Sequence, residues 1–198
     1  MPIDDGDRLA PVSWLFGEPE QPRHDEGNDR EPGRNGEFER INNVSMRALA
    51  RRGMSIAEMR DFLVRRDFDS AEVEQECDRL LSVGLLDDRV LAESLLSTLR
   101  DRKGLGRSGV VAELRRRKID SSVIDAVLSQ SAEHDETELD RALQVAARRA
   151  RQLGSLDRDT ARRRLSAFLL RKGYSAGIAM IATDRSLESA ASTGPVFR

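Results

Sequence analysis

The chain has 198 residues, of which 38% are hydrophobic, 34% are charged and only 4% are aromatic. Strands draw on β-branched and aromatic side chains, so this composition favours charged helices over sheets. No apolar run reaches the roughly 18 residues of a membrane span, and the N-terminus lacks the apolar core of a signal peptide. Cys77 is the single cysteine, which excludes an internal disulfide and indicates a reducing compartment, so we expect a cytoplasmic protein.

The first 40 residues differ from the rest of the chain in charge and composition. They hold 11 acidic and 5 basic side chains, whereas residues 41–198 hold 24 acidic and 28 basic ones. Five of the six prolines also lie there, and such a segment buries too little apolar surface to offset its conformational entropy. We therefore expect residues 1–40 to be a disordered acidic leader. Its apolar island, VSWLFG at residues 12–17, is either a short docking motif or an incidental patch.

Residues 41–86 predict a first unit of three helices. Apolar side chains recur at helical spacing in three stripes: Ile41, Val44, Ala48 and Leu49; Ile56, Met59 and Leu63; and Val73, Cys77, Leu80 and Leu81. Ser55 with Glu58, and Asp69 with Glu72, have the spacing of capping boxes at the starts of the second and third helices. We expect Cys77 to be a core residue on this stripe, as isolated cysteines usually are.

Residues 87–132 predict a second unit, with acidic Asp87 and Asp88 suited to a helix N-terminus. Its apolar stripes are Leu91, Leu95 and Leu99; Val110, Val111 and Leu114; and Val123, Ile124, Val127 and Leu128. The glycines of KGLGRSG (103–109) break the first helix, and Asp120 or Ser121 starts the third.

Residues 133–188 predict a third unit, followed by a frayed tail over 189–198. The capping box at its entry is Asp135 with Glu138. Its stripes are Leu139, Leu143 and Ala146; Ala161, Leu165, Phe168 and Leu169; and Ile178 and Ile181.

The three units are copies of one pattern. LVRRDFDSAEVEQEC (63–77), LRRRKIDSSVIDAVL (114–128) and LLRKGYSAGIAMIAT (169–183) align on their first leucines, at steps of 51 and 55 residues. A basic pair, a large apolar residue and a helix-starting polar residue then share columns in all three. Each unit is too small to bury its apolar face alone, so stacked neighbours should stabilise one another. We expect an all-α protein of three tandem three-helix repeats in an elongated, curved array.

The chemistry-bearing residues do not predict an enzyme. His24 and His134 lie in the leader and a linker, and neither is placed beside a serine or cysteine as a base would be. Metal ligation lacks paired His or Cys residues. KGLGRSG lacks the Gly-Lys-Ser/Thr ending of a phosphate-binding loop. We expect no catalytic residue, no metal and no cofactor.

Clustered cations are the strongest candidates for a binding surface. They are Arg100, Arg102, Lys103 and Arg107; Arg115, Arg116, Arg117 and Lys118; Arg148, Arg149 and Arg151; Arg162, Arg163 and Arg164; and Arg171 and Lys172. Basic residues near helix C-termini also complement the helix dipole, which explains the recurring pairs at 65–66, 116–117 and 171–172 without any ligand. The group at 100–107 is explained less well, and suits an acidic protein groove or DNA phosphates.

The aromatic residues favour a protein partner over single-stranded DNA. Base stacking needs exposed aromatic platforms. Phe62, Phe68, Phe168 and Tyr174 all stand at core-like positions. Direct reading of bases is therefore not expected, whereas weak contact with phosphates is.

Four stretches of the chain resemble the RecX family of bacterial recombination regulators. They are SIAEMRDFLVRRDFD (55–69), GLLDDRVLAE (84–93), RKGLGRSGVVAELRRRKID (102–120) and RRRLSAFLLRKGYS (162–175). With the repeats, the resemblance covers about residues 41–188. The chain departs from the family's usual residues at five positions: Leu91, Leu105, Arg107, Asp67 and Lys118.

The resemblance implies a partner and a mode of action. Proteins of this family bind the RecA recombinase filament on single-stranded DNA as elongated helical modules, and they hinder its growth, ATP hydrolysis and strand exchange in recombination and repair. A monomer that lies along this filament is therefore expected. Two alternatives stay open: a helical protein that binds DNA phosphates without RecA, and a scaffold for some other partner.

Overall fold

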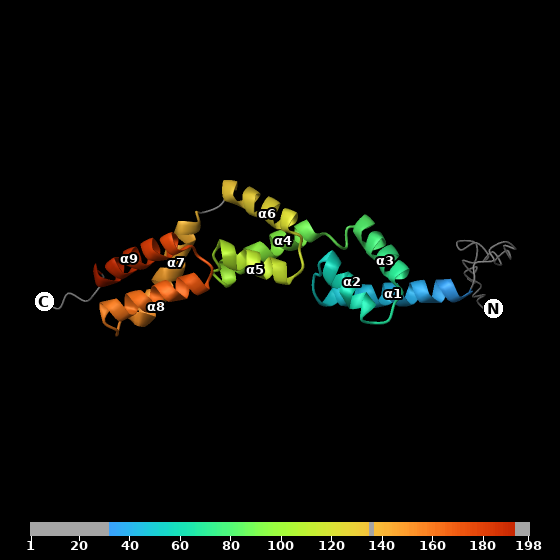
Figure 1. Cartoon of the computed structure of the whole chain (residues 1–198), viewed down its shortest axis with the longest axis horizontal. Coiled ribbons are helices and arrows are strands. Elements are labelled where there is room, and N and C mark those ends of the chain that lie inside the picture. The colour runs from blue at the N-terminus through green and yellow to red at the C-terminus, as the bar shows by residue number, and fades with distance from the viewer. Residues whose placement is uncertain (1–31, 135–136, 193–198) are drawn as a thin grey trace, which may run out of the picture.

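The computed structural model describes residues 32–134 and 137–192, and all regular secondary structure in these ranges is helical. The helices are α1 (Pro32–Arg51), α2 (Ile56–Val64), α3 (Ser70–Ser82), α4 (Asp88–Ser97), α5 (Arg107–Arg116), α6 (Ser121–His134), α7 (Glu138–Ala150), α8 (Arg158–Arg171) and α9 (Ala176–Ser192). A π-helical turn, η1 (Thr98–Arg102), extends α4, and a 3₁₀ turn, η2 (Arg151–Leu153), extends α7. Figure 1 shows the helices in three successive groups along an elongated body.

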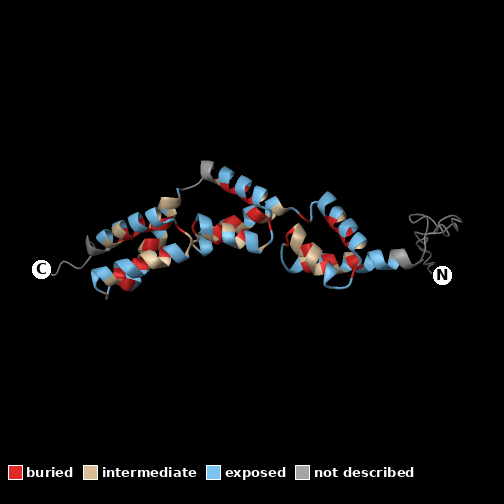
Figure 2. Cartoon of the chain, in the orientation of Figure 1, coloured by how far each residue is buried: buried red, intermediate tan, exposed pale blue. Residues whose placement is uncertain are grey.

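Each group of three helices surrounds a hydrophobic core of its own. The fully buried large side chains include Met59 and Leu63 in the first, Leu114 and Leu128 in the second, and Leu165 in the third. Figure 2 shows the buried residues gathered between the helices of each group, with exposed residues around them. The predicted all-α fold of three tandem three-helix repeats is confirmed. Cys77 is 1% exposed and lies in the first core, as predicted.

Local capping signals fix several helix starts where the sequence predicts them. Ser55 caps α2 and Asp69 caps α3, each in a complete capping box with the glutamate three residues later. Asp87 caps α4 by accepting hydrogen bonds from two backbone N–H groups. At α7 the predicted cap was wrong. Thr137 is the N-cap, with its hydroxyl accepting from the N–H of Asp140, and the predicted cap lies outside the described residues.

Both ends of the helical region extend further than expected. Helix α1 begins at Pro32, so the predicted disordered leader is wrong for residues 32–40. A proline in the first helical turn costs no hydrogen bond, because the first N–H groups of a helix have no partner within it. Helix α9 continues to Ser192, past the predicted start of the frayed tail. The island at residues 12–17 lies outside the described residues.

Small residues line the third core where larger ones were expected. Leu81 in the first repeat and Ile181 in the third are each 39% exposed, so their predicted core positions are wrong. In the third repeat, α7 buries Ala146, as predicted, and α7 and α9 also bury four alanines that were not predicted: Ala142, Ala150, Ala179 and Ala182. Alanine side chains let two helix backbones approach closely. The alanines therefore form the contact between α7 and α9, whereas the larger Ile181 beside them is left exposed.

A buried polar cluster joins α1 to α3 in the first repeat. Glu76 is 0% exposed, and both of its oxygens accept from the guanidinium of Arg79, at 2.7 and 2.8 Å. The hydroxyl of Ser45 donates to the same carboxylate, and Arg79 also donates to Asn42 Oδ1 at 2.8 Å. Burial raises the pKa of Glu76, but the hydrogen bonds from Arg79 and Ser45 outweigh it and leave this pKa below its ordinary value.

The junction between the first and second repeats is ionic. Arg117, just after α5, donates to the carboxylate of Glu58 at 2.8 and 2.9 Å and to the carbonyl of Gly53 at 2.7 Å. Lys118 forms an ion pair with Asp61 on α2. Burial raises the pKa of Glu58, but hydrogen bonds that include those from Arg117 lower it overall. Charged side chains therefore hold the first repeat to the second.

At the junction between the second and third repeats, backbone atoms of the two repeats contact each other directly. Gly106 N–H donates to the carbonyl of Lys172 at 2.9 Å, and Ser108 N–H donates to the carbonyl of Gly173 at 3.2 Å. The Ser108 hydroxyl donates to the same oxygen at 2.7 Å. A Cβ on Gly106 would stand 2.6 Å from the Gly173 oxygen and from the Tyr174 nitrogen, so only glycine allows this approach.

Candidate partner-binding cleft

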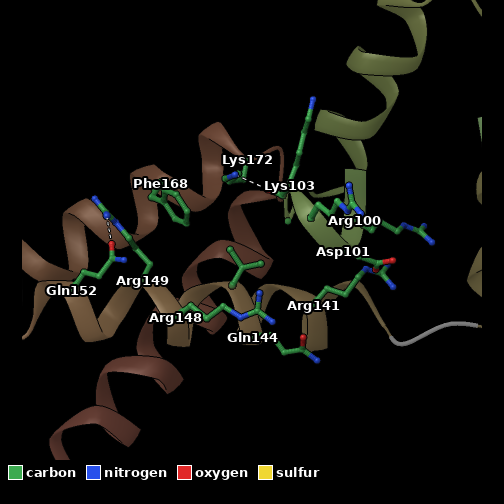
Figure 3. A pocket seen from close by; sticks show the side chains of 13 residues that line it. Arg100, Asp101, Lys103, Arg141, Gln144, Arg148, Arg149, Gln152, Phe168 and Lys172 are labelled. Carbon is green, nitrogen blue, oxygen red and sulfur yellow. Dashed lines mark hydrogen bonds between the residues drawn. The ribbon is translucent and has the colours of Figure 1, made fainter. Parts of the chain in front are cut away.

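A hollow of about 300 Å³ lies at the junction between the second and third repeats. We call it the cationic cleft. Its basic side chains are Arg100, Arg102, Lys103, Arg141, Arg148, Arg149 and Lys172, and its other lining residues are Asp101, Gly104, Gln144, Val145, Gln152 and Phe168. Figure 3 shows ten of these residues labelled around the hollow; they come from η1 and the turn after it, from α7 and η2, and from the C-terminal end of α8. Seven cations face one carboxylate, which makes the cleft suited to an anionic partner.

One wall is set by the π-helical end of α4 and the glycine turn behind it. Residues 98–102 wind as a π-helical turn, which carries Arg100 and Arg102 at the end of the helix. Gly104 then reverses the chain with φ 59°, and a Cβ at this position would stand 2.9 Å from a methyl group of Val145. The glycine lets the loop lie against α7. The buried phenol of Tyr174 donates to the Gly104 carbonyl at 3.3 Å, and burial raises its pKa.

The facing wall is one side of α7. Arg141, Gln144 and Arg148 lie at helical spacings of three and four residues, so they share a face, and the same helix carries Arg149. Figure 3 shows Arg141, Gln144 and Arg148 in a row along the helix. Arg149 donates to Gln152 in the η2 turn, which holds its guanidinium at the edge of the cleft.

Phe168 forms the third side of the cleft. Its side chain is partly buried. It packs against the third core, as predicted, but it also lines the hollow, which was not predicted. The guanidinium of Arg149 lies 5.5 Å from its ring centroid, and the ammonium of Lys172 lies 5.6 Å from it. Lys172 also donates to the carbonyl of Lys103 at 2.6 Å. The cleft thus combines cations with an accessible aromatic ring, which sequence reasoning missed.

The structure brings together six of the sixteen cations singled out in the sequence. Those in the cleft are Arg100, Arg102, Lys103, Arg148, Arg149 and Lys172. Arg141 joins them although the sequence analysis overlooked it. Its signal was its place seven residues before Arg148, two helical turns away on the same face.

The other ten cations fall into different surroundings. Arg117 and Lys118 are engaged at the first junction. Arg116 pairs with Glu113, and Arg162 pairs with Asp184 at 2.8 Å. The rest lie apart from the cleft: Arg107 and Arg115 beside a separate hollow, Arg151 beside a third, and Arg163, Arg164 and Arg171 on exposed helix surface.

The described residues offer little for other chemistry. No group of three or more His, Cys, Asp or Glu side chains within residues 32–134 and 137–192 could hold a metal ion. Burial raises the pKa of the Cys77 thiol, which disfavours its reactive thiolate form. Among the helices of these ranges, none is long and apolar enough to cross a membrane.

The fold defines a tandem helical-repeat protein, and the cationic cleft lies at the junction of two of its repeats. The sequence profiles of two RecX domains match it: the second three-helix domain over residues 87–128 and the third over residues 136–182. The chain is 35% identical over 144 residues to the regulatory protein RecX of Amycolatopsis mediterranei, across 72% of this chain and 80% of the relative. It is 32% identical over 145 residues to that of Streptomyces lividans, across 73% and 76%.

The solved structures agree with the sequence relatives. The crystal structure of RecX from Lactobacillus salivarius superposes with a TM-score of 0.67 at 18% identity, over 78% of this chain and 99% of that one. This likeness supports the fold. The sequence identities above establish that the chain belongs to the RecX family of regulatory proteins.

Proposed function

We propose that this chain is a non-enzymatic regulator that binds the RecA–single-stranded DNA filament and mainly inhibits filament growth, ATP hydrolysis and strand exchange. Membership of a family of regulatory proteins supports a role in RecA regulation. The observation that carries the proposal furthest is the cationic cleft, because it places seven basic side chains at one repeat junction of an elongated body.

The shape and charge of the array suit a polymeric partner. A filament presents the same surface at regular intervals, and three similar repeats can contact it at several points. Linked contacts add through effective concentration, so each can be modest while the whole binds well. Arginine side chains bind carboxylates in bidentate geometry, and such pairs strengthen where water is partly excluded. We propose that the cleft receives an acidic surface of the filament.

The repeats proposed as binding units are residues 41–86, 87–132 and 133–188, with the first reaching back to Pro32 through α1. We propose that the protein acts as a monomer in the cytoplasm. Sedimentation velocity over a range of micromolar concentrations tests the monomer, since a shift to larger species with concentration contradicts it.

The experiment for the main proposal titrates the purified protein into RecA, ATP and single-stranded DNA. We expect ATP hydrolysis to fall and filaments to shorten at micromolar protein. A second arm changes Arg100, Arg102 and Lys103 together to Ala, which should weaken inhibition without loss of helical content by circular dichroism. Unchanged hydrolysis and filament length with the wild-type chain would refute the proposal.

A second candidate function is favoured by Phe168. An aromatic ring flanked by Arg149 and Lys172 resembles the stacking platforms that bind single-stranded nucleic acid. A helical protein that binds DNA without RecA is therefore the alternative. Its binding to naked DNA should weaken steeply as salt rises, because counterion release drives it. Tight, salt-sensitive binding to naked DNA together with no binding to recombinase would favour this alternative.

A further inference from the structure

The second helix of every repeat ends in the same turn. The central residue of each turn has a positive φ: Asp67 (62°), Lys118 (55°) and Gly173 (89°). Its N–H donates to the carbonyl three residues earlier, in Val64 (3.1 Å), Arg115 (2.9 Å) and Leu170 (3.0 Å). A cation precedes the central residue each time: Arg66, Arg117 and Lys172. We call these three the docking turns.

Two of the docking turns hold the preceding repeat. In the second repeat, Arg117 reaches the carbonyl of Gly53, in the loop before α2, at 2.7 Å. In the third repeat, Lys172 reaches the carbonyl of Lys103, in the loop before α5, at 2.6 Å. The cation at the equivalent position thus makes a similar contact, to a carbonyl in the loop before the second helix of the preceding repeat, although the rest of each junction differs in chemistry. The turn is the element with which one repeat binds the next.

The docking turn of the first repeat has no earlier repeat among the described residues to bind. Arg65, Arg66 and Asp67 are all exposed there. The guanidinium of Arg66 lies 3.8 Å from the ring centroid of Phe62, which orients it on the surface. Asp67 keeps its left-handed conformation, which is unfavourable for an L-residue. The turn is therefore preformed in the geometry that binds a neighbour elsewhere in the chain.

We propose that residues 65–67 form a docking surface for a protein partner. The partner's surface should resemble what Arg117 binds: an open carbonyl in a loop, followed by a helix with a carboxylate near its start. In this chain those groups are Gly53 and Glu58. We propose that the partner is the recombinase filament, which would present a helix with a carboxylate near its start to Arg66. In this respect the inference rests on the proposed function. It adds a second contact at the far end of the array from the cleft (Figure 1).

A second copy of the chain does not fit this surface. The position five residues before the aligned leucine is Glu58 in the first repeat and Gly109 in the second, and both face a docking turn. In the third repeat the same position is Arg164, which is exposed. An incoming Arg66 would meet a like charge there instead of a carboxylate, and this disfavours head-to-tail association.

The test compares three variants for binding to RecA filaments assembled on immobilised single-stranded DNA with a slowly hydrolysed ATP analogue. Arg66→Glu should weaken binding about tenfold, as loss of a well-placed charged contact does. Arg66→Lys should bind like the wild type, because Lys172 serves the same position in the third repeat. Arg47→Glu, an equal charge change at an exposed site on α1, is the matched control and should bind normally. Circular dichroism should show equal helical content in all three.

Three outcomes would overturn the inference. Equal binding of Arg66→Glu and Arg47→Glu to the filament would exclude the turn as a contact while leaving the proposed function intact. An equal loss for Arg66→Glu on naked single-stranded DNA, measured by fluorescence anisotropy, would show that phosphates occupy the turn. Failure of the wild-type chain to bind any filament would overturn both the proposed function and this contact.

Discussion

Gly106→Ala should separate the third repeat from the second without disturbing either core. The added Cβ would stand 2.6 Å from two backbone atoms of the turn at residues 173–174. Ordinary contact begins at 3.4 Å, so the turn has to retreat by about 0.8 Å. Three hydrogen bonds cross this point, from Gly106 N–H to Lys172 and from the Ser108 N–H and hydroxyl to Gly173. At about 1 kcal/mol each, the junction should weaken by about 3 kcal/mol.

The assay pairs small-angle X-ray scattering with urea unfolding followed by circular dichroism. We expect a larger radius of gyration at unchanged helical content, and loss of the single unfolding transition because the third repeat no longer unfolds with the second. Gly177→Ala is the matched control, since a Cβ there meets nothing within 4 Å, and in an exposed helix it should stabilise by up to about 1 kcal/mol. If both variants scatter and unfold alike, the glycine contact does not hold the junction.

Two further changes test the first repeat and its junction with the second. Glu76→Gln should lower the free energy of unfolding by about 3 kcal/mol in urea, because it leaves Arg79 and Ser45 without the buried carboxylate. The folded-state pKa of Glu76 is lowered, so this carboxylate stabilises the fold fully above the ordinary carboxyl pKa and loses its effect as pH falls through the folded-state pKa. The difference in unfolding free energy between wild type and variant should therefore shrink in acid. A difference that grows in acid would refute the assignment. High salt screens the ion pair between Arg117 and Glu58, so the radius of gyration of the wild type should increase near 1 M salt. Arg117→Ala should have this larger radius of gyration already at low salt. If the radius changes with salt to the same extent in both proteins, this ion pair does not hold the two repeats together.

Local signals in the sequence predicted the helices well, because caps and periodicity act over a few residues. Ser55 and Asp69 cap helices where their spacing to a following glutamate said they would. The core residues were harder to predict. Ile181 was expected in the third core, but Ala179 and Ala182 are buried there instead. The distance between α7 and α9 decides which side chains fit between them, and this distance depends on the tertiary structure.

The sequence predicted that the candidate site would be rich in basic side chains, but it did not predict which of them would lie together. Clustering pointed to Arg100 and Arg148 separately, and only the junction between the repeats brings them to one cleft. That junction depends on close approach of backbones at Gly106, which no charge pattern reveals. The same pattern could not show that Arg117 is held inside the array by Glu58. Position relative to the neighbouring repeat, more than residue type, decides which cations face outward.

The central claim is that the cationic cleft binds the recombinase filament. The most direct measurement compares the affinity of two double variants for the filament. Arg102→Glu/Arg148→Glu changes two residues of the cleft. Arg47→Glu/Arg158→Glu is the control, because it makes the same charge change at exposed sites outside the cleft. Our account predicts binding at least about tenfold weaker for the cleft variant and near wild-type binding for the control. Equal affinity of the two variants would contradict it.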